Sequence, residues 1–251
     1  MTTLYDIDAF MSAWAKKEYS EEWDNDGVML CKDLDAPAKK ILVCLEINEK
    51  VATEAKEKGC DLIVTHHPYI FRPLKSICGK DFELAQLLIT AGISVFSYHT
   101  RLDAAQGGVN DVLADTLCLS DVGPFAGLGR VGSLSHEMDE EEFLFFVKQK
   151  LSCHTLRHSR LCGKKIKRVA LLGGAGKDFV PDAARIADAY ITGDLSHNAY
   201  ISANEQGLLA VDAGHYHTEN PVAKVMAQKL SEKFPELEII VSDPICPFYT
   251  F

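Results

Sequence analysis

The chain carries two adjacent histidines, His66 and His67, directly after the apolar run of residues 62–65. Neighbouring side chains of a strand point to opposite faces, but a chain that turns out of a strand can direct two imidazoles toward one site. Pro68 restricts the direction in which the chain leaves. Each imidazole could then bind one ion of a metal pair held about 3.5 to 4 Å apart. The alternative is a pair of solvated or core histidines.

Asp103 is a second candidate, because it follows the apolar run of residues 93–97 and the segment His99-Thr-Arg-Leu. Small residues come directly after it and let the backbone approach closely, so its carboxylate could bridge two cations. His99 lies in the same segment and could be a ligand, a proton-transfer group or a hydrogen-bond partner of a ligand. The alternative for Asp103 is a cap on a helix that begins near Gly108.

His215 and Glu219 form a third candidate pair, four residues apart. Thr218 is a suitable N-cap, and Pro221 is tolerated only in a first helical turn. We therefore expect the last helix to begin at Glu219 and His215 to remain in the preceding loop, which would bring an imidazole and a carboxylate to one site. The alternative is a capping carboxylate beside an exposed histidine.

Two rival sites are weaker. Cys153, His154 and His158 offer zinc ligands, but their segment lacks an apolar helical stripe, and in an extended chain the two imidazoles would lie about 13 Å apart. The stretch Gly173–Lys177 lacks the full GxxxxGK[ST] phosphate-loop pattern. Its amides could still bind an anion, or its glycines could only permit a tight turn.

Apolar runs alternate with helical patterns along the chain, which predicts an α/β fold with parallel or mixed sheets covered by helices on both faces. In such sheets functional side chains gather at the carboxyl ends of the strands, where the candidate residues fall. The expected strands are residues 41–45, 61–65, 93–97, 169–172, 190–192, 208–211 and 238–241, and the expected helices are residues 4–18, 49–58, 82–91, 138–151, 182–189, 198–206 and 219–233.

A stretch rich in glycine and proline, residues 122–129, interrupts this alternation and is the expected domain boundary. We expect a discontinuous metal-binding α/β domain formed by residues 1–125 and 213–251. A second α/β domain would comprise residues 126–212.

Composition excludes several classes of protein. With 26 Lys and Arg against 36 Asp and Glu, the acidic chain is not expected to bind extended nucleic acid. Its eight cysteines contain no CxxC pair, which argues against a disulfide framework or a thiolate zinc finger. We see neither a signal-peptide pattern nor an apolar run of about 18 residues, so we expect a cytoplasmic protein that does not enter a membrane.

Ordered motifs spanning nearly the whole chain resemble those of the Nif-three-like family, the GTP cyclohydrolase I type 2 homologues. The resemblance implies two α/β domains with mixed sheets flanked by helices, a toroidal homohexamer and a dinuclear metal site. It implies the metal ligands His66, His67, Asp103, His215 and Glu219. It also places His99 at a site position, for proton transfer or for supporting a ligand. The motifs are residues 22–27, 61–68 with Phe71, 98–105, 107–111, 173–176, 189–194 and 214–219.

The function implied by the resemblance is metal-dependent hydrolysis, with ring opening of a purine nucleotide such as GTP as the named reaction. A non-enzymatic role in metal trafficking or cofactor assembly is the alternative. Imidazole and carboxylate ligands suit two divalent ions of zinc, iron, manganese or nickel. Two departures concern carboxylates, since Glu46 stands where the family commonly has Asp, and Asp194 where Glu is frequent. A substrate contact at either position is therefore not implied.

Overall fold

The computed structural model describes residues 1–242 and 246–248. The chain forms two compact units: Met1–Gln106 with the described part of Val222–Pro244, and Gly107–Pro221 with the described part of Ile245–Phe251. Each unit contains one mixed sheet flanked by helices. The expected α/β fold with two mixed sheets is thus confirmed. None of the helices within the described residues is both long enough and apolar enough to span a membrane.

The first unit contains a five-stranded sheet in the order β1-β4-β3-β2-β11. Its strands β11, β2, β3 and β4 run parallel, and β1 pairs antiparallel with β4. Because β2, β3 and β4 are adjacent and parallel, the segments that follow them emerge at the same edge of the sheet. The strands are β1 Gly27–Leu30, β2 Lys40–Cys44, β3 Leu62–Thr65, β4 Ser94–Ser97 and β11 Glu238–Val241.

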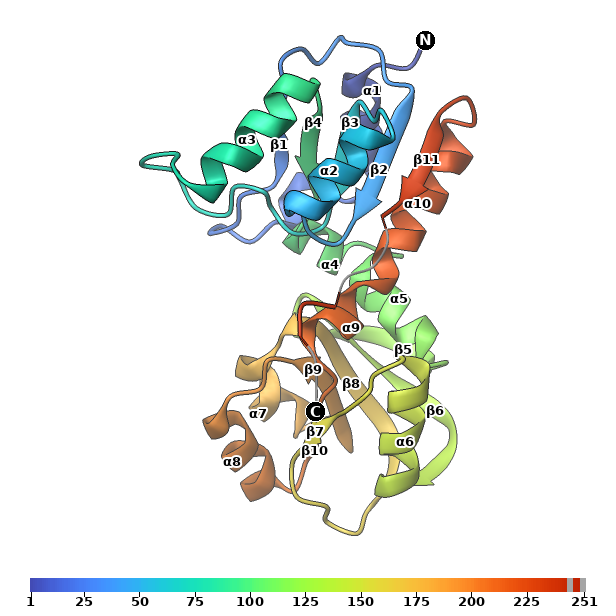
Figure 1. The fold of residues 1–251 in the computed structure, drawn as a ribbon. Helices are drawn as coiled ribbons and strands as arrows, with labels where there is room; N and C mark the ends of the chain where they lie inside the picture. Colours follow the sequence, from blue (N-terminus) through green and yellow to red (C-terminus); the bar gives the residue numbers. More distant parts are fainter. Residues whose placement is uncertain (243–245, 249–251) are drawn as a thin grey trace. The chain divides into compact units, whose positions relative to one another are not determined.

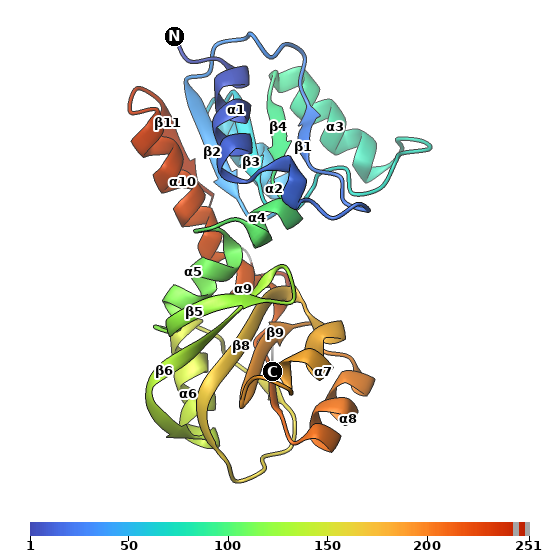
Figure 2. The same ribbon diagram turned by 180° about the vertical axis from the view of Figure 1, so that it is seen from behind.

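Helices cover both faces of this sheet: α2 and α3 lie on one face, and α1 lies on the other (Figures 1 and 2). Leu42, Ile63 and Val95 are buried under α2 and α3, and the nearly continuous burial along β2, β3 and β4 fits the expected two-sided burial. The helices are α1 Leu4–Trp14, the 3-10 turn η1 Lys17–Tyr19, α2 Glu49–Glu57, α3 Lys80–Ala91, α4 Thr100–Ala104 and α10 Pro221–Lys233.

The second unit contains a six-stranded sheet in the order β5-β6-β8-β9-β10-β7, with β8, β9 and β10 parallel. Alternate residues of β8 face opposite layers, since Leu171 packs with α5 and α6, and Leu172 packs with α7 and α8. The strands are β5 Ser120–Phe125, β6 Gly129–Asp139, β7 Arg157–His158, β8 Lys165–Ala175, β9 Ala189–Gly193 and β10 Leu209–Asp212. The helices are α5 Val109–Thr116, α6 Glu140–Lys150, the 3-10 turn η2 Lys177–Phe179, α7 Val180–Ala183, α8 His197–Gln206 and α9 His215–Glu219.

The units divide at 106/107 and 221/222, whereas the sequence placed the divisions at 125/126 and 212/213. The stretch of residues 122–129 is not a linker but part of a hairpin in which β5 pairs with β6. Helices α5 and α9 both pack on β8, so they belong to the second unit. Glycine and proline here mark a turn between strands, a role that sequence composition does not distinguish from a linker.

Candidate metal centre

Three histidines of the first unit lie together at the edge where β3 and β4 end. His66 and His67 follow β3 and His99 follows β4, and these strands are parallel neighbours. Each of the three offers one ring nitrogen, and these nitrogens lie within 4.8 Å of one another. The ring centroid of His99 is 5.3 Å from that of His66 and 5.9 Å from that of His67. The arrangement could hold one metal ion and brings His99 into the same group as the predicted ligands.

His66 is fully buried, and its Nδ1 donates a hydrogen bond of 2.9 Å to the carbonyl oxygen of Tyr98. With the proton on Nδ1, Nε2 carries the lone pair that a metal ligand needs. Nε2 lies 3.6 Å from Oδ1 of Asp103. Asp103 is itself inside α4, and the next helix, α5, has Gly108 as its N-cap. The interpretation of Asp103 as a helix cap is therefore wrong, and so is that of His66 as a solvated residue.

His67 lies beside Glu46, one of the two residues that depart from the family pattern. Glu46 follows β2, and its Oε2 lies 3.6 Å from Nδ1 of His67. The amide of His67 donates to the carbonyl oxygen of Leu45 at 2.8 Å, which ties the histidine to the neighbouring strand's exit. A carboxylate on the Nδ1 side favours Nε2 as the metal-binding atom. Glu46 thus lies beside the Nδ1 atom of a predicted ligand, His67.

His99 is oriented by Asp24, a residue that the sequence did not single out. Oδ1 of Asp24 accepts from Nδ1 of His99 at 2.8 Å, and Oδ2 accepts from the amide and hydroxyl of Thr100 at 3.0 and 2.6 Å. Burial alone would raise the pKa of Asp24, but the hydrogen bonds from His99 and Thr100 outweigh it and lower this pKa to about 2. Asp24 is therefore a carboxylate near neutral pH, and Nε2 of His99 carries the lone pair in the neutral ring.

His215 and Glu219 of the second unit both belong to the short helix α9. The expectation that His215 stays in the loop was wrong, because a separate turn of helix precedes α10. The four-residue spacing places Nε2 of His215 3.0 Å from Oε2 of Glu219. Nδ1 of His215 lies 2.7 Å from Oδ2 of Asp194, the second residue that departs from the family pattern. Asp194 thus orients a predicted ligand.

The glycine stretch at residues 173–176 supports this pair. The amides of Gly173, Gly174 and Gly176 donate to the side chains of Asn110, Thr218 and Thr192, respectively, so the anion-binding interpretation is wrong for these three amides. Gly174 has a φ of 70°, and an added Cβ would collide with Oε1 of Glu219 and lie 3.2 Å from Nε2 of His215. Gly173 and Gly174 thus leave room for the buried side chain of Glu219.

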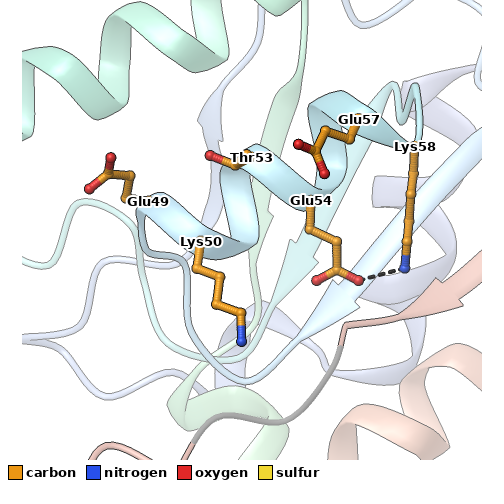
Figure 3. A pocket seen from close by; sticks show the side chains of 6 residues that line it. All are labelled: Glu49, Lys50, Thr53, Glu54, Glu57 and Lys58. Atoms are coloured by element: carbon orange, nitrogen blue, oxygen red, sulfur yellow. Dashed lines mark hydrogen bonds and ion pairs between the residues drawn. The ribbon is translucent and has the colours of Figure 1, made fainter.

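The rival sites do not assemble. Within residues 1–242 and 246–248, the clusters of ligand atoms lying within 4.8 Å of one another do not include Cys153, His154 or His158. Cys153 is buried and donates to the carbonyl oxygen of Ala213, while His158 is exposed in β7. A groove along α2 contains no imidazole or thiol and is lined by one face of this helix, where Glu54 and Lys58 form an ion pair (Figure 3). It is a solvated helix face.

A family model for Duf34/NIF3 (NGG1p interacting factor 3) matches residues 2–246. The chain belongs to the Duf34/NIF3 family. Among its relatives is a Clostridium perfringens protein named "GTP cyclohydrolase 1 type 2 homolog", 35% identical over 252 aligned positions that cover 95% of each chain. A Methanocaldococcus jannaschii protein with the same name is 34% identical, and the alignment covers 95% of this chain and 98% of that protein.

Two solved structures agree with this fold. A Bacillus cereus protein related to NIF3 superposes with a TM-score of 0.94 at 22% identity, covering 100% of this chain and 99% of the other. Reduced HcgD from Methanocaldococcus jannaschii gives a TM-score of 0.85 at 33% identity, covering 96% and 98%. The expected family and fold are confirmed, together with His, Asp and Glu clusters that could bind metal.

Proposed function

We propose that this Duf34/NIF3 protein binds two divalent transition-metal ions and uses them in a hydrolytic reaction. The proposed ligands are the five that the family resemblance implies: His66, His67, Asp103, His215 and Glu219. The observation that carries the proposal is that all three of these histidines have an oxygen atom on the Nδ1 side of the ring. Nδ1 of His66 faces the carbonyl oxygen of Tyr98. Nδ1 of His67 faces the carboxylate of Glu46, and Nδ1 of His215 faces that of Asp194. Such partners orient a histidine for metal binding through Nε2.

The donor set fits the proposed ions. Three imidazoles and two carboxylates suit zinc, iron, manganese or nickel rather than a soft ion that prefers thiolates. Divalent ions bound there would lower the pKa of water and polarise an electrophilic carbon or phosphorus. Nε2 of His99 would transfer a proton, while Asp24 holds its ring in place. Hydrolytic opening of a purine nucleotide ring is the reaction class that the names of the relatives support.

Elemental analysis of protein purified without added metal tests the metal proposal. We expect two ions per chain in the wild type and at most one in His67→Ala and Glu219→Ala. His158→Ala, from the rival cluster, is the control and should retain two. Wild-type protein with fewer than one ion per chain, together with Asp103→Ala of equal content, would contradict a dinuclear site. Size-exclusion chromatography with light scattering on the same samples tests the homohexamer that the family resemblance implies.

Turnover separates hydrolysis from the trafficking alternative. We expect metal-loaded protein to consume GTP, His67→Ala to lose this activity, and His99→Gln to lose it while retaining two ions. Loss of an ion in His99→Gln would make His99 a ligand instead of a proton-transfer group. Metal-loaded protein that leaves GTP unchanged but transfers iron to an acceptor would replace hydrolysis with trafficking.

A further inference from the structure

Two large aromatic side chains of the first unit stand exposed beside His99. Trp23 is 60% exposed and Phe71 is 44% exposed. The ring centroid of His99 lies 6.2 Å from that of Trp23 and 6.0 Å from that of Phe71. The two aromatic rings are themselves 5.9 Å apart. A single exposed aromatic residue is ordinary, but a contiguous pair in contact with a candidate catalytic histidine is not explained by the fold.

The planes of the three rings are all steeply inclined to one another. The interplanar angle is 72° between Trp23 and Phe71, 77° between Trp23 and His99, and 88° between Phe71 and His99. A planar ligand parallel to the indole would therefore meet the other two rings edge to face. Offset stacking and edge-to-face contact are the arrangements that aromatic rings prefer.

The backbone next to both rings is held by polar contacts. The amide of Glu21 donates to the hydroxyl of Thr100 at 3.0 Å, and Asp24 binds His99 and Thr100. The side-chain amide of Asn25 donates to the carbonyl oxygen of Ile70, which precedes Phe71. Rings that are positioned before a ligand arrives lose little conformational entropy on binding.

We propose that Trp23 and Phe71 bind the planar bicyclic ring of a purine-type substrate and hold it against His99. The indole is bicyclic and offers a face of matching size, and stacking on aromatic side chains tolerates any base with a π face. This inference rests on the proposed hydrolytic function and adds the residues that would select its substrate class. A second copy of this chain covering the same rings is the competing occupant.

Binding of guanosine 5′-monophosphate to the metal-free protein tests the inference by isothermal titration calorimetry. Stacking is worth about 1–3 kcal/mol per base, so we expect Trp23→Ala and Phe71→Ala each to weaken binding by about 5- to 160-fold. Trp23→Tyr, which keeps a stacking ring, should restore most of the affinity. Phe82→Ala is the matched control, because Phe82 is 52% exposed in α3 of the same unit, and it should leave affinity unchanged.

Three results would overturn the inference. One is wild-type protein that does not bind guanosine 5′-monophosphate at millimolar concentration. Another is a Trp23→Ala or Phe71→Ala protein that loses as much affinity for ribose 5-phosphate, which lacks the purine ring, as for guanosine 5′-monophosphate. The third is a Trp23→Ala protein whose oligomeric state changes, since the rings would then form an interface between copies. Metal content separates this inference from the metal proposal: Trp23→Ala should retain its ions, and His67→Ala should bind the base after losing them.

Discussion

The carboxylate of Asp24 and the Nδ1 atom of His99 are joined by a 2.8 Å hydrogen bond, although the two residues are 75 positions apart in the sequence. The same carboxylate binds the amide and hydroxyl of Thr100, at the start of α4. Asp24 therefore fixes both the ring of His99 and the helix that carries Asp103. It links the orientation of a proton-transfer group to the position of a predicted metal ligand.

Asp24→Asn should weaken metal binding. An amide is uncharged and cannot accept on both of its terminal atoms, so it cannot reproduce the contacts to His99 and Thr100. Loss of a carboxylate that supports a metal site typically costs about 10- to 100-fold in metal affinity or activity. Titration of zinc into metal-free protein measures the change. Asp35→Asn, at an exposed position, is the control and should bind zinc like the wild type. Equal affinity in Asp24→Asn would contradict this role.

The sequence alone identified much of the first unit's site, because parallel strands with continuous apolar runs determine where their carboxyl ends meet. His66, His67 and His99 could be found in this way, since each follows such a run. Asp24 could not, because it lies in an irregular segment and its partner is distant in the sequence. Its place in the motif of residues 22–27 was the signal that could have identified it. Contacts between distant segments depend on packing that local patterns do not encode.

The helix α9 shows a second limit of sequence patterns. Pro221 correctly indicated that a helix begins near it, and α10 does begin there. A five-residue helix directly before it has too few residues to show a periodic apolar face, so the sequence placed His215 in a loop. The pairing of His215 with Glu219 was nevertheless expected, although from a loop histidine beside the first residue of a helix. In the structure the pair instead forms through the four-residue spacing within α9.

Asp194→Asn should reduce zinc affinity with little change in stability. Asp194 has a φ of 54°, a left-handed conformation that Asp and Asn tolerate better than Glu or Ala does. The substitution therefore retains the backbone and removes the charge beside Nδ1 of His215. We expect about a ten-fold loss of zinc affinity or more. Asp178→Asn, exposed in the same unit, is the control. Unchanged affinity in Asp194→Asn would show that the charge does not support His215.

Asp194→Glu tests why this chain departs from the family pattern at this position. The longer side chain would have to adopt the left-handed conformation, which costs a residue other than Gly, Asn or Asp about 1–2 kcal/mol. We expect a lower free energy of unfolding in urea than for Asp194→Asn. An equally stable Asp194→Glu protein would show that the backbone does not select Asp here.

Gly174→Ala should disturb the second unit's candidate ligands more than its backbone strain alone explains. Gly174 and Gly163 have φ values of 70° and 69°, but an added Cβ at Gly163 would meet no atom within 4 Å, whereas at Gly174 it would collide with Glu219. Both variants should lose about 1 kcal/mol from strain. Only Gly174→Ala should lose more than this in urea unfolding and also lose metal. Equal stability losses and equal metal contents in the two variants would contradict a packing role for Gly174.

Thiol reactivity should follow burial. Burial raises the pKa of Cys44 to about 12 and that of Cys60 to about 11, so at pH 8 these thiols are almost entirely protonated as well as inaccessible. Cys78 and Cys162 are exposed. With iodoacetamide at pH 8, mass spectrometry of peptides should show rapid modification of the exposed pair and none of the buried pair. Raising the pH to 9 should speed the modification of the exposed pair only. In guanidinium, which unfolds the protein, all four thiols should be modified. Modification of Cys44 in the folded protein would contradict its place in the core.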